Sequence, residues 1–490
     1  MTVRLSSSNL AKLPGSVAVP SYKRSEISAG ILHFGVGNFH RSHQAVYLDD
    51  LFNLGGDHDW GIVGAGVLEG EKAGRQKLAE QDWLTTVVEQ DAGHAAARVT
   101  GAMVDFLVPG DTDAIVAKLA DPAIRIISLT ITEGGYFIDP STGRFNPQDP
   151  DIVTDAGDPD HPKTVFGLIL TGLRRRREAE EKPFTVMCCD NIPHNGHVTM
   201  DTLCGLAELY DPAFASWVAD NVAFPNAMVD RITPATTDRE RELLKQEFGV
   251  EDAWPVFCEP FKQWVLEDRF TLGRPALEKV GVQFVEDVSP FELMKIRILN
   301  GGHAAIAYPA GLMDIHFVHE AMQHELVRGY LEKLHLTEIM PTVPPVPDTD
   351  LEAYRQLIVQ RFSNPKIGDT IRRLCLDGSN RQPKFIIPTI ADQLRDGGSI
   401  EGLALESALW CRYCYGTTES GAEIAPNDPN WDRLVATSRS AKADPAAWLG
   451  MEDIYGEVGR APVFAEAFAR HLTALWRNGT RTVLGRYLSG

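Results

Sequence analysis

The feature that most limits the fold of this chain is a series of short, almost wholly apolar runs separated by helical stretches in the first half. The runs read ILHFG at 31–35, GIVGAGV at 61–67, IRIISLTIT at 124–132 and FTVMCCD at 184–190. Strands that helices cover on both faces have this composition, because neither face meets water. The pattern therefore predicts an α/β fold built on a parallel sheet.

The length of the chain and a change in its texture predict two domains. At about 150 residues per domain, a chain of 490 residues is too long for one ordinary domain. After about residue 285 the sequence reads mostly as helices rich in Leu, Ala, Glu and Arg, with few β-branched runs. We predict an N-terminal α/β domain over 1–285 and a mostly helical domain over 286–490.

The charge, the apolar pattern and the cysteine content argue against several classes of binding partner and of cellular location. The 67 acidic and 47 basic side chains give a net charge of −20, which repels nucleic acids and anionic membranes. No apolar run approaches the roughly 20 residues of a membrane helix, and the N-terminus lacks a signal-peptide core. Seven scattered cysteines do not resemble a disulfide framework. We expect a cytoplasmic monomer or small homo-oligomer.

A dinucleotide turn follows the first apolar strand. The segment GVGNFH at 35–40 joins that strand to a helical pattern over 41–51. Gly35 permits a tight turn, and Gly37 lets the backbone approach phosphates at a helix N-terminus. His40 stands where the third glycine of the usual fingerprint would be, and a lone Gly-x-Gly is a weak signal.

An acid at the end of the second strand strengthens this interpretation. Glu69 can accept hydrogen bonds from ribose hydroxyls and would repel a 2′-phosphate, which favours NAD over NADP. Strand, turn, helix, strand and acid in this order predict a Rossmann-like domain that binds NAD. Arg75 keeps NADP as an alternative, and Glu69 is also readable as one ordinary acid among 67.

A second chemical motif lies on a helix that begins at Ser289-Pro290, a favourable helix start. At about 100° per residue, Glu292 and His303 lie roughly 60° and 80° from Lys295, and Asn300 lies about 140° from it. A buried lysine has a lowered pKa, so its free amine can take the proton of an alcohol. An asparagine amide can then stabilise the oxyanion.

Two glycines, Gly301 and Gly302, follow within the same helix. Glycine inside a helix costs stability, so we interpret the pair as room for a ligand or another backbone to approach. The alternative for the whole helix is a structural Lys–Glu pair with Asn300 capping a nearby group.

Two further polar segments follow predicted strands. Asn191 comes directly after the strand at 184–190, and Thr132 and Glu133 end the strand at 124–132. Ligands of open α/β sheets bind at the carboxyl ends of the strands, so these residues are candidates for substrate or nicotinamide contacts. An Asx turn is the alternative for Asn191, and a more credible one for Asn195.

Taken together, these motifs resemble those of the polyol-specific long-chain dehydrogenases, and the members that act on mannitol-like hexitols are the most similar. The matching segments are GVGNFHR at 35–41, TEGGY at 132–136, CDNIPHNG at 189–196, KIRILNGGH at 295–303 and LDGSNRQPKF at 376–385. The likeness covers nearly the whole chain, and the lysine motif is specific. Two departures are Gly134, where the family often has Lys or another residue, and Leu68, where many members carry a second acid.

The resemblance implies hydride transfer between a secondary alcohol and NAD without a metal. It makes Lys295 the general base, Asn191 and Asn300 the oxyanion pocket, His303 a substrate-orienting residue and Glu292 a partner of Lys295. It also implies substrate contacts at Asp230, Arg373 and Arg381, and cofactor contacts at Gly35, Gly37, Phe39, His40, Arg41, Glu69, Thr132 and Glu133. No zinc site is expected, since Cys411-x-x-Cys414 has no second pair.

The implied reaction interconverts a D-mannitol-like hexitol and its 2-ketose, D-fructose. Two alternatives within the family are a sugar-acid oxidoreductase acting on fructuronate or mannonate, and an arabinitol dehydrogenase. The arginines at 373 and 381 favour the first, because cations can hold a carboxylate. An alternative of a different class is a non-catalytic NAD-binding regulatory protein.

Overall fold

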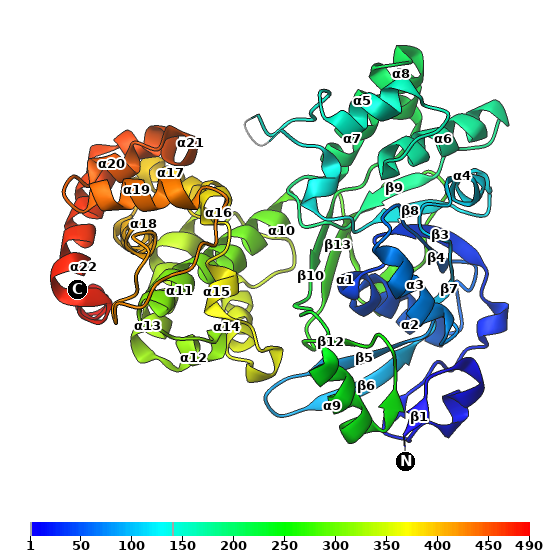
Figure 1. Ribbon diagram of the computed structural model, residues 1–490, viewed down its shortest axis with the longest axis horizontal. Coiled ribbons are helices and arrows are strands. Elements are labelled where there is room, and N and C mark those ends of the chain that lie inside the picture. The colour runs from blue at the N-terminus through cyan, green and yellow to red at the C-terminus, as the bar shows by residue number, and fades with distance from the viewer. Residues whose placement is uncertain (1, 140–141) are drawn as a thin grey trace. The chain divides into compact units, whose positions relative to one another are not determined.

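The computed structural model describes residues 2–139 and 142–490. The chain divides into two compact units, Met1–Val288 (unit 1) and Ser289–Gly490 (unit 2), shown in Figure 1. The predicted boundary after residue 285 lies between the last strand of unit 1 and the first helix of unit 2.

A five-stranded parallel sheet forms the centre of unit 1, in the order β7-β4-β3-β8-β9. Its strands are β3 (Ala29–Phe34), β4 (Gly61–Ala65), β7 (Met103–Phe106), β8 (Ile126–Leu129) and β9 (Thr185–Cys188). Numbered by appearance within this sheet, the order is 3-2-1-4-5, that of a doubly wound Rossmann fold. Its order reverses between β3 and β8, where ligands bind such sheets. The predicted α/β class is confirmed.

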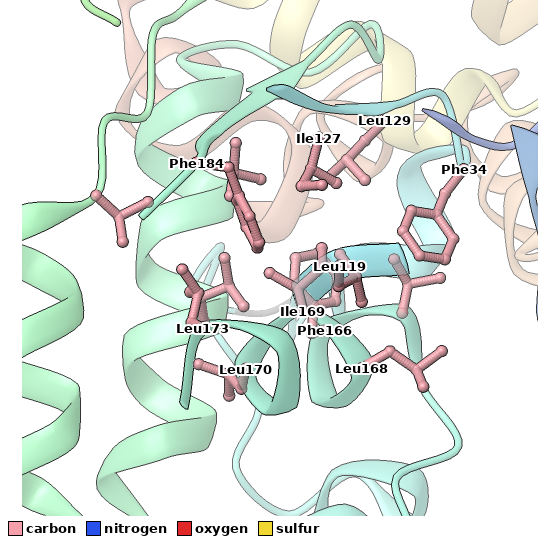
Figure 2. Close-up of a cluster of buried hydrophobic side chains, with 14 of the residues drawn as sticks. Phe34, Leu119, Ile127, Leu129, Phe166, Leu168, Ile169, Leu170, Leu173 and Phe184 are labelled. Carbon is pink, nitrogen blue, oxygen red and sulfur yellow. The ribbon is translucent and has the colours of Figure 1, made fainter. Parts of the chain in front are cut away.

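Both faces of this sheet are buried, which explains the apolar runs of the sequence. Leu32 and Phe34 of β3 point to one face, where they pack with helices α4 (Thr112–Ala120) and α6 (Val165–Glu178). Figure 2 shows this cluster, with Ile127 and Leu129 directed toward Phe166 of α6. Ile31 points to the other face, against α2 (Gln44–Asn53) and the strands of a second sheet.

Three smaller sheets complete the strands of unit 1, in the orders β12-β5-β6-β2, β10-β13-β14 and β1-β11. Their strands are β1 (Val3–Arg4), β2 (Val17–Ala18), β5 (Thr85–Gln90), β6 (Ala95–Thr100), β10 (Ala227–Asp230), β11 (Val250–Glu251), β12 (Val256–Cys258), β13 (Gln263–Glu267) and β14 (Gln283–Val285). The remaining α-helices of unit 1 are α1 (Asn38–Ser42), α3 (Glu71–Ala79), α5 (Pro150–Gly157), α7 (Asn195–Glu208), α8 (Pro212–Asn221) and α9 (Asp238–Phe248). Its 3₁₀ helices are η1 (Ser7–Lys12), η2 (Arg24–Glu26), η3 (Glu133–Tyr136) and η4 (Leu277–Val280).

Unit 2 is helical, as predicted. Its α-helices are α10 (Ser289–Met294), α11 (Gly301–Leu312), α12 (Val318–Gln323), α13 (Glu325–Leu334), α14 (Leu351–Phe362), α15 (Ile371–Leu374), α16 (Gly378–Phe385), α17 (Ile387–Asp396), α18 (Glu401–Tyr413), α19 (Trp431–Ala441), α20 (Ala446–Leu449), α21 (Glu452–Tyr455) and α22 (Pro462–Ser489). Two π-helical segments, η5 (Lys295–Asn300) and η6 (His335–Ile339), interrupt them, and the 3₁₀ helices are η7 (Met340–Thr342), η8 (Pro365–Ile367) and η9 (Gly456–Arg460). Helix α11 is central, because it packs against α13, α15 and α18. Within the described part of the chain, no helix is both long and apolar enough to cross a membrane.

Candidate functional site

The glycine turn of unit 1 lies at the point where the order of the sheet reverses. Gly35 adopts a φ of +90°, and a Cβ there would lie 2.0 Å from the Thr130 carbonyl oxygen at the end of β8. Only glycine fits this close approach of two strands. Beside Gly37, a Cβ would meet nothing nearer than the Gly35 carbonyl oxygen at 3.8 Å, and no side chain caps the helix that follows. The turn therefore has the space and the uncapped amides that a phosphate group requires.

His40, at the third fingerprint position, is accommodated by a second histidine. Its ring stacks on His33 of β3, with ring centroids 3.4 Å apart and an interplanar angle of 14°. His33 contacts the Ser128 hydroxyl at 3.1 Å and the Thr130 hydroxyl at 3.0 Å, so it connects β3 to β8. Burial lowers the pKa of His33 to about 3, and burial with nearby His33 and Arg41 lowers the pKa of His40. Both rings are neutral at physiological pH and contact the interior of unit 1. His33, which the sequence analysis missed, had no detectable signal beyond its place on a strand.

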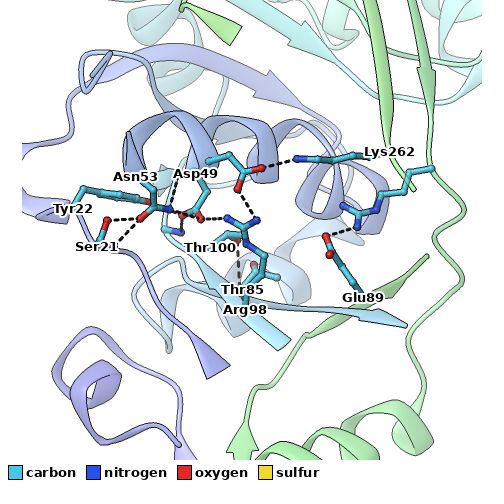
Figure 3. Close-up of polar contacts among 12 residues, drawn as sticks. Ser21, Tyr22, Asp49, Asn53, Thr85, Glu89, Arg98, Thr100 and Lys262 are labelled. Atoms are coloured by element: carbon cyan, nitrogen blue, oxygen red, sulfur yellow. Dashed lines mark hydrogen bonds and ion pairs between the residues drawn. The ribbon is translucent and has the colours of Figure 1, made fainter. Parts of the chain in front are cut away.

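Arg41 and a network of polar side chains around Asp49 stabilise α1 and α2, the two helices that follow the glycine turn. The Arg41 guanidinium donates to Asn38 Oδ1 at 2.7 Å and to the Trp254 carbonyl, and it stacks on the Trp254 ring. Further along, Asp49 accepts hydrogen bonds from Tyr22 and Arg98, both at 2.6 Å (Figure 3). Phe39, between these regions, is half-buried and stacks on His43. Arg41 and its neighbours therefore support the shape of the turn.

The acid predicted to select the cofactor lies beyond the end of β4. Glu69 is exposed and forms an ion pair with Lys72 at 2.7 Å. Leu68 beside it is also exposed, at 66%. Arg75 donates to the Phe106 carbonyl at 2.6 Å, so its guanidinium is engaged at the end of the neighbouring strand β7. The lysine paired with the acid was missed by the sequence analysis, although its i, i+3 spacing is a usable signal.

Asp190 joins the ends of β8 and β9. Its carboxylate accepts hydrogen bonds from the amides of Ile131 and Thr132, each at 2.9 Å, and from the Tyr136 hydroxyl at 2.6 Å. These contacts hold Thr132 at a φ of +66°, a conformation that a β-branched residue rarely adopts. Thr132 and Glu133 are both exposed there. Asp190 lies in a segment that the sequence analysis marked, but its role needs the pairing of two strand ends.

The other candidates of unit 1 lie at or just after the ends of strands. Asn191 is exposed directly after Asp190. Asn195, in contrast, is buried and pairs with the backbone of Ala227 through both its amide nitrogen and its oxygen, at 2.7 and 2.9 Å. Asn195 therefore has a structural role that joins α7 to β10, which differs from the local Asx turn kept open for it. Asp230 ends β10 and is 7% exposed.

In unit 2 the predicted base lies on a π-helix. Lys295 begins η5, Asn300 ends it, and the Gly301 amide bonds to the Ile296 carbonyl five residues earlier. The regular α-helical projection of the sequence analysis, which separated Lys295 from Asn300 by about 140°, is therefore wrong for this segment. Hydrogen bonding from i to i+5 widens the turn, so residues five apart lie nearer the same face. Lys295 and Glu292 are buried, with 8% and 7% exposed.

His303 lies one turn beyond Asn300, among arginines. Its ring stacks on Phe362 at 4.2 Å, and its Nε2 has no hydrogen-bond partner among the described residues. Burial chiefly, and then Arg373, Arg361 and Arg381, lower its pKa well below the ordinary value. Unit 2 thus brings His303 together with both predicted arginines and with Arg361, which the sequence analysis missed.

Both arginines of the predicted substrate contacts have partners of their own. Arg373 forms a two-point ion pair with Asp369, and Arg381 donates to the Leu374 carbonyl at 3.1 Å.

In residues 2–139 and 142–490, no group of three or more His, Cys, Asp or Glu side chains is arranged to hold a metal ion.

Comparison with known proteins matches both units to one family. Residues 29–279 match the family described as the mannitol dehydrogenase Rossmann domain, and residues 287–476 match the mannitol dehydrogenase C-terminal domain. The two matches meet close to the division between the units.

Relatives and solved structures match over nearly the full length. A mannitol 2-dehydrogenase of Cereibacter sphaeroides is 59% identical over 476 residues, which cover 97% of this chain and 99% of the relative. One from Aspergillus fumigatus is 39% identical, covering 99% of each. The Pseudomonas fluorescens mannitol 2-dehydrogenase, solved as a ternary complex with NAD and D-mannitol, is 44% identical at a TM-score of 0.89 over 99% of this chain and all of that one. A substrate-free D-sorbitol dehydrogenase is 35% identical at a TM-score of 0.91, over 98% of this chain and 100% of that one. The chain therefore belongs to the mannitol dehydrogenase family.

Proposed function

We propose that this chain is an NAD-dependent polyol dehydrogenase that interconverts D-mannitol and D-fructose. The observation that carries the proposal is the likeness, over 99% of the chain, to a mannitol 2-dehydrogenase solved with NAD and D-mannitol. The uncapped turn after β3 supports dinucleotide binding, and the buried lysine on the π-helix supports proton transfer.

The residues of unit 1 fit NAD. The open space beside Gly37 suits a pyrophosphate, and the exposed Glu69 suits ribose hydroxyls. The buried pair His33 and His40 would hold the turn in place. NAD, when bound, accepts the hydride that leaves the alcohol carbon.

The residues of unit 2 would move the proton. The unprotonated Lys295 amine takes the hydroxyl proton as the C–H bond gives up its hydride, so the alcohol carbon becomes a carbonyl. Asn300 donates a hydrogen bond to the oxygen as its negative charge develops. His303, with a free Nε2, is suited to orient the substrate hydroxyl. We assign no metal to this step, since the amine and the amide supply the base and the oxyanion contact.

The contacts that Arg373 and Arg381 already form within unit 2 support a neutral polyol, and not a sugar acid, as the substrate. A carboxylate substrate needs a cation whose charge is available. Asp369 already neutralises Arg373, and Arg381 donates to the Leu374 carbonyl. The positive charge of Arg381 keeps a sugar acid as the second candidate substrate class.

A substrate panel tests the proposed function. With NAD in excess, we expect D-mannitol to give NADH absorbance with a kcat/KM at least tenfold above D-arabinitol and D-mannonate. The rate should be unchanged after dialysis against EDTA. If the enzyme turns over D-mannonate but not D-mannitol, its substrate belongs to the sugar-acid class. NADH binding without turnover of any polyol or sugar acid would support the non-catalytic alternative.

Glu69 is expected to determine cofactor choice. Because Leu68 provides no second acid, the substitution Glu69→Gln removes a carboxylate that repels a 2′-phosphate and leaves Lys72 to attract it. The ratio of kcat/KM with NAD to that with NADP should fall about 10-fold or more, equivalent to about 1.4 kcal/mol. Glu80→Gln, which changes an acid at the end of α3, is the matched control and should leave the ratio unchanged. An unchanged ratio in Glu69→Gln would place the discrimination elsewhere.

A further inference from the structure

The π-helical segment that carries Lys295 has a hydrogen-bond donor from outside its own helix. The Ile298 carbonyl, in the middle of η5, lies 2.9 Å from Nε2 of His335. A carbonyl oxygen only accepts, so Nε2 must carry the hydrogen. His335 Nδ1 has no partner among the described residues, and burial lowers the pKa of the ring to about 4. His335 is therefore a neutral donor at physiological pH.

Glycine at position 302 makes room for this contact. A Cβ on Gly302 would lie 2.9 Å from His335 Nε2 and 3.2 Å from its Cε1, so any other residue would displace the ring. At Gly301 the nearest atom to a Cβ is the Phe385 carbonyl oxygen at 3.4 Å, an ordinary contact. Gly302 thus admits a side chain, where the sequence analysis expected a ligand or another backbone, whereas Gly301 does lie nearest to another backbone.

The His335 ring belongs to a second π-helical segment, which neighbouring helices hold in place. His335 begins η6 and is fully buried. Glu338, in the same segment, accepts hydrogen bonds from the amides of Gly402 and Leu403 at the start of α18, at 2.7 and 2.8 Å. Gln393 of α17 donates to the Glu338 carbonyl at 2.5 Å. The donor therefore stands on a segment that two further helices hold in place.

We propose that His335 is a positioning residue that maintains the π-helical turn between Lys295 and Asn300, and so directs both side chains toward the substrate. This proposal rests on the proposed function of Lys295 as the base. Without the donor, η5 is free to take up regular α-helical hydrogen bonding, in which residues five apart diverge by about 140°. The amine and the oxyanion-binding amide would then no longer serve one alcohol oxygen.

The experiment compares four variants in steady-state mannitol oxidation. His335→Leu and Gly302→Ala should each lower kcat about 10- to 100-fold, because a displacement of about 1 Å has effects of this size. His335→Gln retains an N–H donor and should remain within about threefold of the unsubstituted enzyme. Gly301→Ala, the matched control for an added methyl group, should do the same. The double variant His335→Leu/Gly302→Ala should be no slower than the slower single variant, since both remove one contact.

Two readouts separate positioning from a loss of stability. The acid limb of the kcat profile, which reports the base, should shift in His335→Leu and Gly302→Ala, while NADH affinity stays constant. If both variants keep the kcat and the acid limb of the unsubstituted enzyme and only lower the Tm, the proposal is overturned. Should His335→Leu fail to fold, the comparison of Gly302→Ala with Gly301→Ala decides. Failure of the proposed function is distinguishable, because Lys295→Ala would then leave turnover unchanged.

Discussion

Replacing Lys295 with alanine is expected to lower kcat for mannitol oxidation roughly 10³-fold, because general-base catalysis contributes about 10² to 10⁴ in such reactions. NADH affinity should change less than twofold, since the residues assigned to the cofactor lie on the glycine turn and strand ends of unit 1. Stopped-flow absorbance of NADH formation measures the first quantity, and titration of NADH fluorescence measures the second.

The dependence of the rate on pH tests the same role of Lys295, and its expected direction differs between oxidation and reduction. Lys295 accepts a proton only when its amine is neutral, so the oxidation rate of the unsubstituted enzyme should fall as pH decreases through the pKa of the lysine. In ketose reduction the ammonium form donates the proton, so the rate should fall as pH increases. Lys295→Ala should lose both limbs. Added methylamine should restore part of its rate, because a small amine fits the space that the side chain leaves.

Two controls test whether the effect belongs to the amine. Lys295→Met keeps an aliphatic chain of similar length and should be as slow as Lys295→Ala, but without rescue by methylamine. Lys333→Ala removes a lysine of α13 that bonds to the Tyr487 carbonyl, and it should retain turnover. If Lys295→Ala keeps its rate, the base lies elsewhere. If no variant changes NADH binding and the unsubstituted chain never turns over, the chain is a non-catalytic NAD-binding protein.

The sheet was predictable because burial on two faces leaves a strong signal. Four of the five strands of the central sheet overlap the predicted apolar runs, and β3 carries Leu32 and Phe34 on one face with Ile31 on the other. The edge strand β7, which contains Asp105, was not predicted. Each of these runs continues past the last residue of its strand, because the chain leaves the sheet there and enters the loop at the carboxyl end of the strand. The run at 124–132 ends as strand at Leu129, since Asp190 then binds the amides of Ile131 and Thr132. That contact joins residues about 60 positions apart and has no local pattern.

The candidate site was predictable where residue type alone limits the chemistry. Gly35 was identified because few other residues permit the turn, and its φ of +90° agrees with that reading, whereas Gly37 leaves open space beside the turn. The stack of His33 on His40 was not predictable, because it needs the strand and the helix to be brought together first. The same is true of His335, which lies 37 positions from the carbonyl it contacts.

The geometry of the lysine helix was mispredicted for a different reason. A helical projection assumes one hydrogen-bond pattern throughout, and a π-turn changes that pattern without a change in apolar spacing. The glycines at 301 and 302 were the local signal that something approaches the helix. They did not say that the approaching group is an imidazole, nor that it contacts a carbonyl of the π-turn.

A buried acid in the core of unit 2 carries the second large prediction. Glu406 of α18 is fully buried, and its Oε1 accepts a hydrogen bond from Gln382 at 2.6 Å. Its Oε2 has no partner among the described residues, and neither has Gln382 Oε1. Burial raises the pKa of Glu406 to about 8 from an ordinary value of 4.5. Folding therefore keeps this carboxyl protonated at pH values where the unfolded chain would ionise it.

Substituting Glu406→Gln should stabilise unit 2 by an amount that grows with pH. The raised pKa means that the contribution of Glu406 is fully present below pH 4.5 and is lost as pH rises toward 8. At about 1.4 kcal/mol per pKa unit, the variant should gain little at pH 4.5, about 3 kcal/mol at pH 7 and nearly 5 kcal/mol at pH 9. Urea unfolding at these three pH values measures the gain. Glu338→Gln is the matched control and should lose stability at pH 7, because its carboxylate accepts the amides of Gly402 and Leu403. A gain in Glu406→Gln that is equal at all three pH values would mean that shape, and not the charge of the carboxyl, limits the stability of this core.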